Sequence, residues 1–90
     1  MPMFVVERDW PEAGKFTAEQ VQLLTERSCQ VLRNMGPDIQ WIQSFVTDNK
    51  VYCIYMSPDE ETIRIHAEIG GFPANSIQEV RSVIDPSTAC

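Results

Sequence analysis

A β-hairpin between two helical segments is the feature that most constrains the fold of this 90-residue chain. Ile39–Thr47 (IQWIQSFVT) and Lys50–Met56 (KVYCIYM) are rich in β-branched and aromatic residues, which is typical of strands. Asp48 and Asn49 separate them, and residues of this kind suit a two-residue hairpin turn. The middle of the chain is therefore predicted to form two antiparallel strands.

This turn determines which side chains share a face of the sheet. Smaller side chains pair on one face: Val46 with Val51, Ser44 with Cys53 and Ile42 with Tyr55. Bulkier ones pair on the other: Phe45 with Tyr52, Gln43 with Ile54 and Trp41 with Met56. Both faces are largely apolar, whereas a sheet with one solvated face alternates more cleanly. We therefore expect helices to cover one face and a second copy of the chain to cover the other.

The helical segments have clear start and stop signals. Apolar residues recur at three- and four-residue spacings in Phe16–Met35, where Thr17 and Gln20 match a capping box and a Gly-Pro pair follows. The segment Ser57–Gly70 opens with Ser-Pro-Asp-Glu, which predicts a capping box with proline at the first helical position. A second glycine after this segment ends the helix.

Two further strands, Met3–Arg8 and Ile77–Ile84, complete the order β-α-β-β-α-β. That order predicts an α+β fold, the ferredoxin-like plait, with a four-stranded antiparallel sheet and two helices on one face. The right-handed crossover rule places the strands in the spatial order 4-1-3-2. We expect residues 1–90 to form one domain, with an ordered core over about 3–85 and a C-terminal tail over 86–90.

Composition excludes several classes of function. The net charge is −6 with scattered Lys and Arg, which argues against nucleic acid and against anionic membranes as partners. No apolar run is long enough to span a bilayer, and the N-terminus lacks the features of a signal peptide. Cys29, Cys53 and Cys90 are an odd set without C-x-x-C spacing, so neither a zinc knuckle nor a disulfide framework is expected. A cytoplasmic protein is the resulting prediction.

His66 is the only histidine, and by helical projection it lies at the centre of an apolar arc. Ile63 and Ala67 flank it on one side, and Ile65 and Ile69 on the other. A ring that titrates near neutral pH and can bind a metal therefore faces the interior. The plainer interpretation is a hydrogen-bonded core histidine.

The hairpin register gives His66 two alternative sets of neighbours. If the smaller face meets the helices, the neighbours are Ser44, Cys53 and Tyr55. If the bulkier face does, they are Trp41, Gln43 and Tyr52. We favour the first set because small residues under a helix allow close approach.

A histidine near a cysteine suits two kinds of chemistry. The pair can act as a nucleophile with its base, or as two ligands of nickel, copper or zinc, to which Glu7 can add a carboxylate. Alternatively, Cys53 is a small buried hydrophobe, and Glu7 and Arg8 form a solvated pair at the end of a strand.

Six runs of the sequence together resemble a known family: Phe4–Arg8, Trp41–Ser44, Tyr52–Tyr55, Glu61–Ala67, Gly71–Pro73 and Ile77–Val80. It is a small family of uncharacterised, ferredoxin-like proteins labelled nickel-binding protein. The resemblance implies a homodimeric plait that binds nickel or a similar divalent ion. Carried over by position, the implied metal ligands are His66, Cys53 and Glu7. The implied pocket residues are Trp41, Ser44, Tyr52 and Tyr55.

The main functional hypothesis is a non-enzymatic binding protein that holds a divalent transition metal and has neither catalytic residues nor an organic cofactor. The alternative is a cofactor-free dimeric enzyme, resembling a monooxygenase or isomerase, with a pocket between sheet and helices. There His66 is the general base and Tyr52 or Tyr55 the orienting donor. A third possibility is a subunit that only mediates protein association.

Overall fold

The computed structural model describes all residues from Met1 to Cys90. Six regular elements follow one another: β1 (Met3–Asp9), α1 (Ala18–Met35), β2 (Gln40–Val46), β3 (Lys50–Met56), α2 (Glu60–Gly70) and β4 (Ser76–Glu79). Two short 3₁₀ helices, η1 (Ala13–Lys15) and η2 (Pro86–Thr88), lie before α1 and near the C-terminus.

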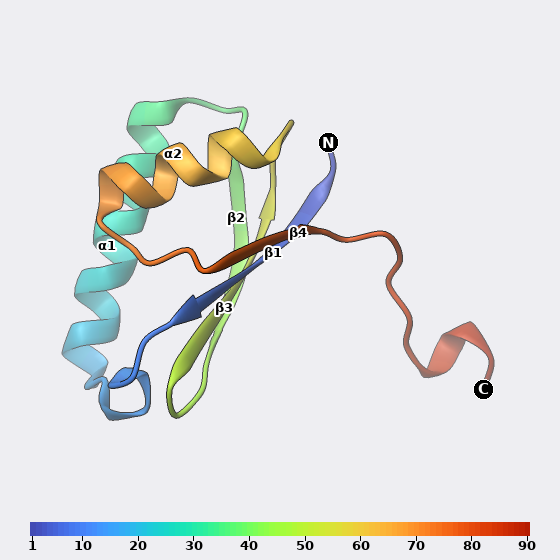
Figure 1. Cartoon of the computed structure of the whole chain (residues 1–90), viewed down its shortest axis with the longest axis horizontal. Coiled ribbons are helices and arrows are strands. Elements are labelled where there is room, and N and C mark those ends of the chain that lie inside the picture. Colours follow the sequence, from blue (N-terminus) through green and yellow to red (C-terminus); the bar gives the residue numbers. More distant parts are fainter.

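The sheet is antiparallel and has the order β2-β3-β1-β4. Both helices lie on the same side of it (Figure 1). The predicted ferredoxin-like α+β fold and its strand order are thus confirmed. Neither helix is long and apolar enough to cross a membrane.

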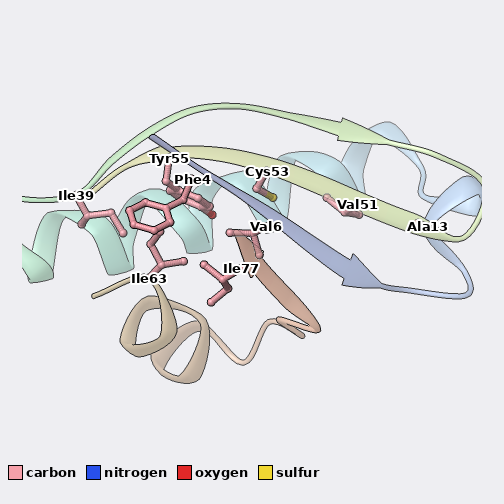
Figure 2. Packing of buried hydrophobic residues seen from close by; sticks show 9 residues of the cluster. All are labelled: Phe4, Val6, Ala13, Ile39, Val51, Cys53, Tyr55, Ile63 and Ile77. Carbon is pink, nitrogen blue, oxygen red and sulfur yellow. The ribbon is translucent and has the colours of Figure 1, made fainter. Parts of the chain in front are cut away.

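The core lies between the helices and one face of the sheet, which we call the covered face (Figure 2). Burial alternates along β1 and β3, so every second side chain points into this layer. On β3 the inward residues are Val51, Cys53 and Tyr55, and α2 contributes Ile63, which is fully buried. The smaller face of the predicted hairpin is therefore the one that meets the helices.

The start of α1 is as predicted, and that of α2 is not. Thr17 accepts a hydrogen bond from the Gln20 backbone, and the Gln20 side chain returns one, which completes the capping box. The predicted capping box of α2, opening at Ser57, is wrong. Its N-cap is Asp59, whose carboxylate accepts from the Thr62 amide at 2.8 Å. Ser57 is fully buried and donates to the Asp59 carbonyl instead.

The predicted hairpin register is correct near the turn, but the observed register shifts by one residue further from it. Val46 pairs with Val51 and Ser44 with Cys53, as predicted, but a bulge at Ile42 places Trp41 opposite Tyr55. The predicted pairs of Ile42 with Tyr55 and of Trp41 with Met56 are therefore wrong. The bulge turns Ile42 outward, where it is 51% exposed, and turns the indole of Trp41 toward the covered face.

The last strand is shorter than the predicted Ile77–Ile84. Its final ladder bond runs from the Val80 amide to the Met3 carbonyl, and Met3 is the first residue of β1. Because β4 is antiparallel to β1, the chain beyond Val80 has no partner strand. It runs away from the body of the protein (Figure 1), with Val83 and Ile84 exposed.

Candidate binding cavity

A cavity of about 200 Å³ lies between the covered face of the sheet and α1. Fourteen residues line it, and ten of them are hydrophobic. Helix α1 contributes Leu24, Thr25 and Ser28 to its wall. Trp10 and Phe16, in the segment before α1, also line it and meet edge to face with their ring centres 5.2 Å apart. The result is a mostly apolar cavity with a few polar groups in its wall.

The most unusual group in this wall is the guanidinium of Arg8, which is only 2% exposed. Its Nε donates to Cys53 Sγ at 3.4 Å, and its Nη2 donates to the Tyr55 hydroxyl at 3.2 Å. Its Nη1 donates to the Pro73 carbonyl, and the group lies 5.6 Å from the centre of the Phe72 ring. These partners carry no carboxylate, and the ion pairs of the chain involve Lys50, Arg64 and Arg81 instead. A buried cation without an acidic partner is rare because desolvation penalises it.

The interpretation of Glu7 and Arg8 as a solvated surface pair is thus wrong for Arg8. Inward positions of β1 alternate, so Arg8 follows Phe4 and Val6 into the core. The alternation in the sequence already predicts that Arg8 points inward, but the charge of the side chain favoured a solvated position. Glu7 points to the opposite face and lies 3.5 Å from Lys50 Nζ.

A second series of hydrogen bonds reaches Cys53 from β2. Trp41 Nε1 donates to Ser44 Oγ at 2.9 Å, and Ser44 Oγ donates to Cys53 Sγ at 2.9 Å. The bulge makes this possible, because it brings Trp41 to the same side as Ser44 although the two are three residues apart. The buried Cys53 sulfur therefore accepts from both Arg8 and Ser44.

His66 is fully buried, as the helical projection predicted, and it lies behind the cavity wall. Its Nε2 shares a hydrogen bond with Ser28 Oγ at 3.3 Å, and its Nδ1 has no partner. The ring centre lies 5.4 Å from that of Tyr55 and 5.6 Å from that of Phe72. Burial, and then the positive charge of Arg8, lower the pKa of His66 from 6.5 to about 4. The imidazole is therefore neutral at physiological pH.

Of the other residues on the arc of α2, Ile63 and Ala67 are buried with His66, and Ile65 and Ile69 are exposed. Gly70 at the end of the helix lets the Phe72 ring approach, since a Cβ there would lie 2.2 Å from a ring carbon.

Tyr55 is a further polar group in the cavity wall. Burial, followed by the neighbouring Cys53, raises the pKa of Tyr55 to about 12, so its hydroxyl keeps its proton at neutral pH. That hydroxyl accepts from Arg8, and a hydrogen bond with Cys53 is among the causes that raise its pKa. Arginine does not lose its charge in proteins, so Arg8 gives this wall a permanent positive charge.

The structure thus brings Trp41, Ser44, Cys53 and Tyr55 to one cavity, with His66 directly behind it. Tyr52 and Glu7 pair with each other in the register of β1 and β3, and both side chains point to the other face of the sheet. Sequence reasoning did not identify Arg8 and Ser28 as members of the site.

These residues do not fit a resident divalent metal within one chain. No three His, Cys, Asp or Glu side chains come together anywhere in the structure. The cavity wall offers one thiol, Cys53, which already accepts two hydrogen bonds, and the guanidinium beside it repels a cation. A transition-metal site needs about four donors.

Comparison with known proteins gives one family and one fold. The family model described as "Nickel responsive protein SCO4226-like" matches residues 4–80. Among solved structures, the crystal structure of SCO4226 from Streptomyces coelicolor A3(2) superposes with a TM-score of 0.77 at 18% sequence identity. The match covers 91% of this chain and 99% of that one, and at this identity it shows a shared fold. No curated protein matches the chain.

Proposed function

Because the chain belongs to the SCO4226-like family of nickel-responsive proteins, we propose that it is a small binding protein whose ligand site is the cavity between the sheet and α1. The observation that carries this proposal is a largely apolar cavity whose wall includes a buried guanidinium and a tyrosine hydroxyl. Ligand sites in proteins typically combine an apolar wall with a few convergent polar groups.

Two features favour binding over catalysis. His66, the general base of the enzymatic alternative, lies behind the wall and does not line the cavity. Its pKa of about 4 also makes it too weak a base near neutral pH, where an effective catalytic base has a pKa close to the working pH. Tyr52, one of the two proposed orienting donors, points to the other face of the sheet.

Nickel held directly by the protein is a second candidate. The family description supports it, as does a neutral imidazole whose Nδ1 has no partner. One chain supplies only His66 and Cys53 near the cavity, and a copy packed on the other face of the sheet cannot reach them, so a nickel ion there must complete its coordination with water. Calorimetric titration with NiCl₂ tests this candidate. Saturable uptake that is lost in His66→Ala would support it, and no heat of binding would reject it.

The sheet face that no helix covers, which we call the open face, carries exposed apolar side chains. Phe45 is 52% exposed there, and Tyr52 and Ile54 are only partly buried. The C-terminal segment adds Val83 and Ile84, 72% and 78% exposed, as further apolar surface. We propose a homodimer packed sheet against sheet, which removes this apolar area from water.

The state of the cysteines supports a reducing compartment. Cys29, Cys53 and Cys90 are all free thiols. Disulfides form and persist in oxidising compartments and are rare in the cytosol. We propose the cytoplasm as the location of the protein.

The cavity is tested with benzyl alcohol, a neutral ring-sized probe, followed by NMR titration. We expect saturable shifts at residues of the wall in the wild type and none in Thr25→Phe, which fills the cavity from α1. Glu26→Phe, an exposed position next to Thr25 that does not line the cavity, is the matched control and should bind like the wild type. If the probe shifts the same residues in Thr25→Phe, or shifts none in the wild type, the cavity is not the ligand site.

A further inference from the structure

We propose that the cavity binds a small organic anion, a carboxylate on an apolar body of about one aromatic ring, with the carboxylate held by Arg8 and Tyr55. The inference rests on the proposed function of the cavity as a ligand site and names the chemical class of the ligand. Three independent properties of the cavity lead to it: its charge, its free hydrogen-bond donors and its size.

The first property is an uncompensated positive charge. Arg8 is 2% exposed, its three hydrogen-bond partners are a thiol, a hydroxyl and a carbonyl, and it takes part in no ion pair. The carboxylate next to it in the chain, Glu7, points to the opposite face and lies near Lys50. Buried charges in proteins are normally paired. An anion in the cavity supplies the missing counter-charge, and a single negative charge neutralises it.

The second property is the set of donors that remain free. A guanidinium has five N–H donors, and three atoms of Arg8 each use one in the bonds described above. Each Nη group therefore keeps one N–H, and these two suit the two oxygens of a carboxylate. Tyr55 also lines the cavity, and its hydroxyl, which accepts from Arg8, can rotate its proton toward a bound carboxylate. Its raised pKa keeps that proton in place at neutral pH.

The third property is size. An apolar cavity of about 150 Å³ is known to hold benzene. At about 200 Å³, this cavity has room for one ring and a carboxylate, and it is smaller than the pockets that hold drug-sized ligands. The rings of Trp10, Phe16 and Trp41 in its wall provide apolar contact for such a body.

The same properties disfavour other ligands. A bare divalent cation meets the like charge of Arg8 and lacks carboxylate ligands. Inorganic phosphate has no apolar part to bury against the hydrophobic wall, and as a dianion it leaves one charge unpaired.

The experiment compares phenylacetate with benzyl alcohol, a neutral analogue with a similar ring, by calorimetry and NMR on the whole chain. Inorganic phosphate and NiCl₂ serve as the two other ligand classes. We expect the wild type to bind phenylacetate at least about tenfold more tightly than benzyl alcohol, because hydrogen bonds to a charged group contribute about 1.5–3 kcal/mol.

Two variants locate the anion. Arg8→Met keeps the length and apolar contacts of the side chain and removes its charge, so we expect it to lose the preference for phenylacetate while it still binds benzyl alcohol. Tyr55→Phe removes one donor with little change in shape, and we expect it to weaken phenylacetate about fivefold. Tyr55→Phe keeps the test decisive if Arg8→Met fails to fold, as judged by circular dichroism.

The outcomes separate the two levels of the proposal. If benzyl alcohol binds in the cavity and phenylacetate shows no preference, or if phosphate or NiCl₂ binds there more tightly, the anion proposal is wrong and the cavity stands as a ligand site. If neither ring compound binds, the proposed function fails as well. A preference for phenylacetate that persists unchanged in both variants also overturns the assignment to Arg8 and Tyr55.

Discussion

The two faces of the sheet are built from the same strands and differ in how their polar groups are satisfied. On the covered face, Arg8 and Ser44 reach groups on neighbouring strands and on the Pro73 loop. On the open face, Glu7 lies near Lys50 at the edge of a partly exposed apolar surface. Adjacent residues of β1, Glu7 and Arg8, thus belong to different environments. The alternation of a strand, rather than proximity in sequence, decides which residues share a site.

The strongest test of this contrast compares two tyrosines of β3. Tyr55→Ala on the covered face should reduce the free energy of unfolding by about 4 kcal/mol, because it removes a buried aromatic side chain. Tyr52→Ala on the open face should cost only about 1 kcal/mol. Urea denaturation measures both, and equal losses would show that the two faces are packed alike.

Acid should destabilise the protein through His66. Its pKa is about 4 in the folded protein and 6.5 when exposed, so between these values the unfolded chain binds the proton and the folded chain does not. The contribution of the neutral His66 to the free energy of unfolding is therefore complete above pH 6.5, and about 3 kcal/mol of it is lost as the pH drops to 4. His66→Gln should remove this slope. Denaturation curves measured between pH 4 and 6.5 test this. If the free energy of unfolding of the wild type does not change over that range, the imidazole is in contact with water in the folded protein.

On the open face, Phe45→Lys should weaken self-association by about 2 kcal/mol, roughly thirtyfold in the dissociation constant, because it puts a charge into the proposed dimer contact. Ile69→Lys, an exposed position on α2, is the matched control and should leave association unchanged. Sedimentation equilibrium measures both. If both variants weaken self-association equally, or if the wild type is monomeric, the open face is not the dimer interface.

The smallest effect concerns neighbouring residues of β2. Ser44→Ala should cost about 1 kcal/mol of stability, because Trp41 Nε1 loses its acceptor and Cys53 loses a donor. Gln43→Ala, on the open face, should change stability by less than about 0.5 kcal/mol. Thermal unfolding of the pair measures the difference, and a reversed order would mean that the Ser44 bonds do not contribute.

The sequence was sufficient for the fold because its signals are local: a capping box at Thr17, a tight turn between β2 and β3, and alternation along the strands. The sequence was insufficient where contacts between distant parts of the chain determine the local structure. The bulge at Ile42 brings Trp41 to Ser44 within β2, and the end of β4 follows from the point where β1 begins. Arg8 was missed because a charged residue at the end of a strand is usually solvated, and only the assembled core shows its neutral partners.

In our proposal, Arg8 gives this cavity its preference for an organic anion. The most direct measurement is a crystal structure of the protein grown with 4-bromophenylacetate, with data collected at the bromine absorption edge. We expect one bromine peak inside the cavity and a carboxylate within hydrogen-bond distance of Arg8 and Tyr55. A peak on the open face, or a ring in the cavity with its carboxylate turned away from Arg8, would contradict it.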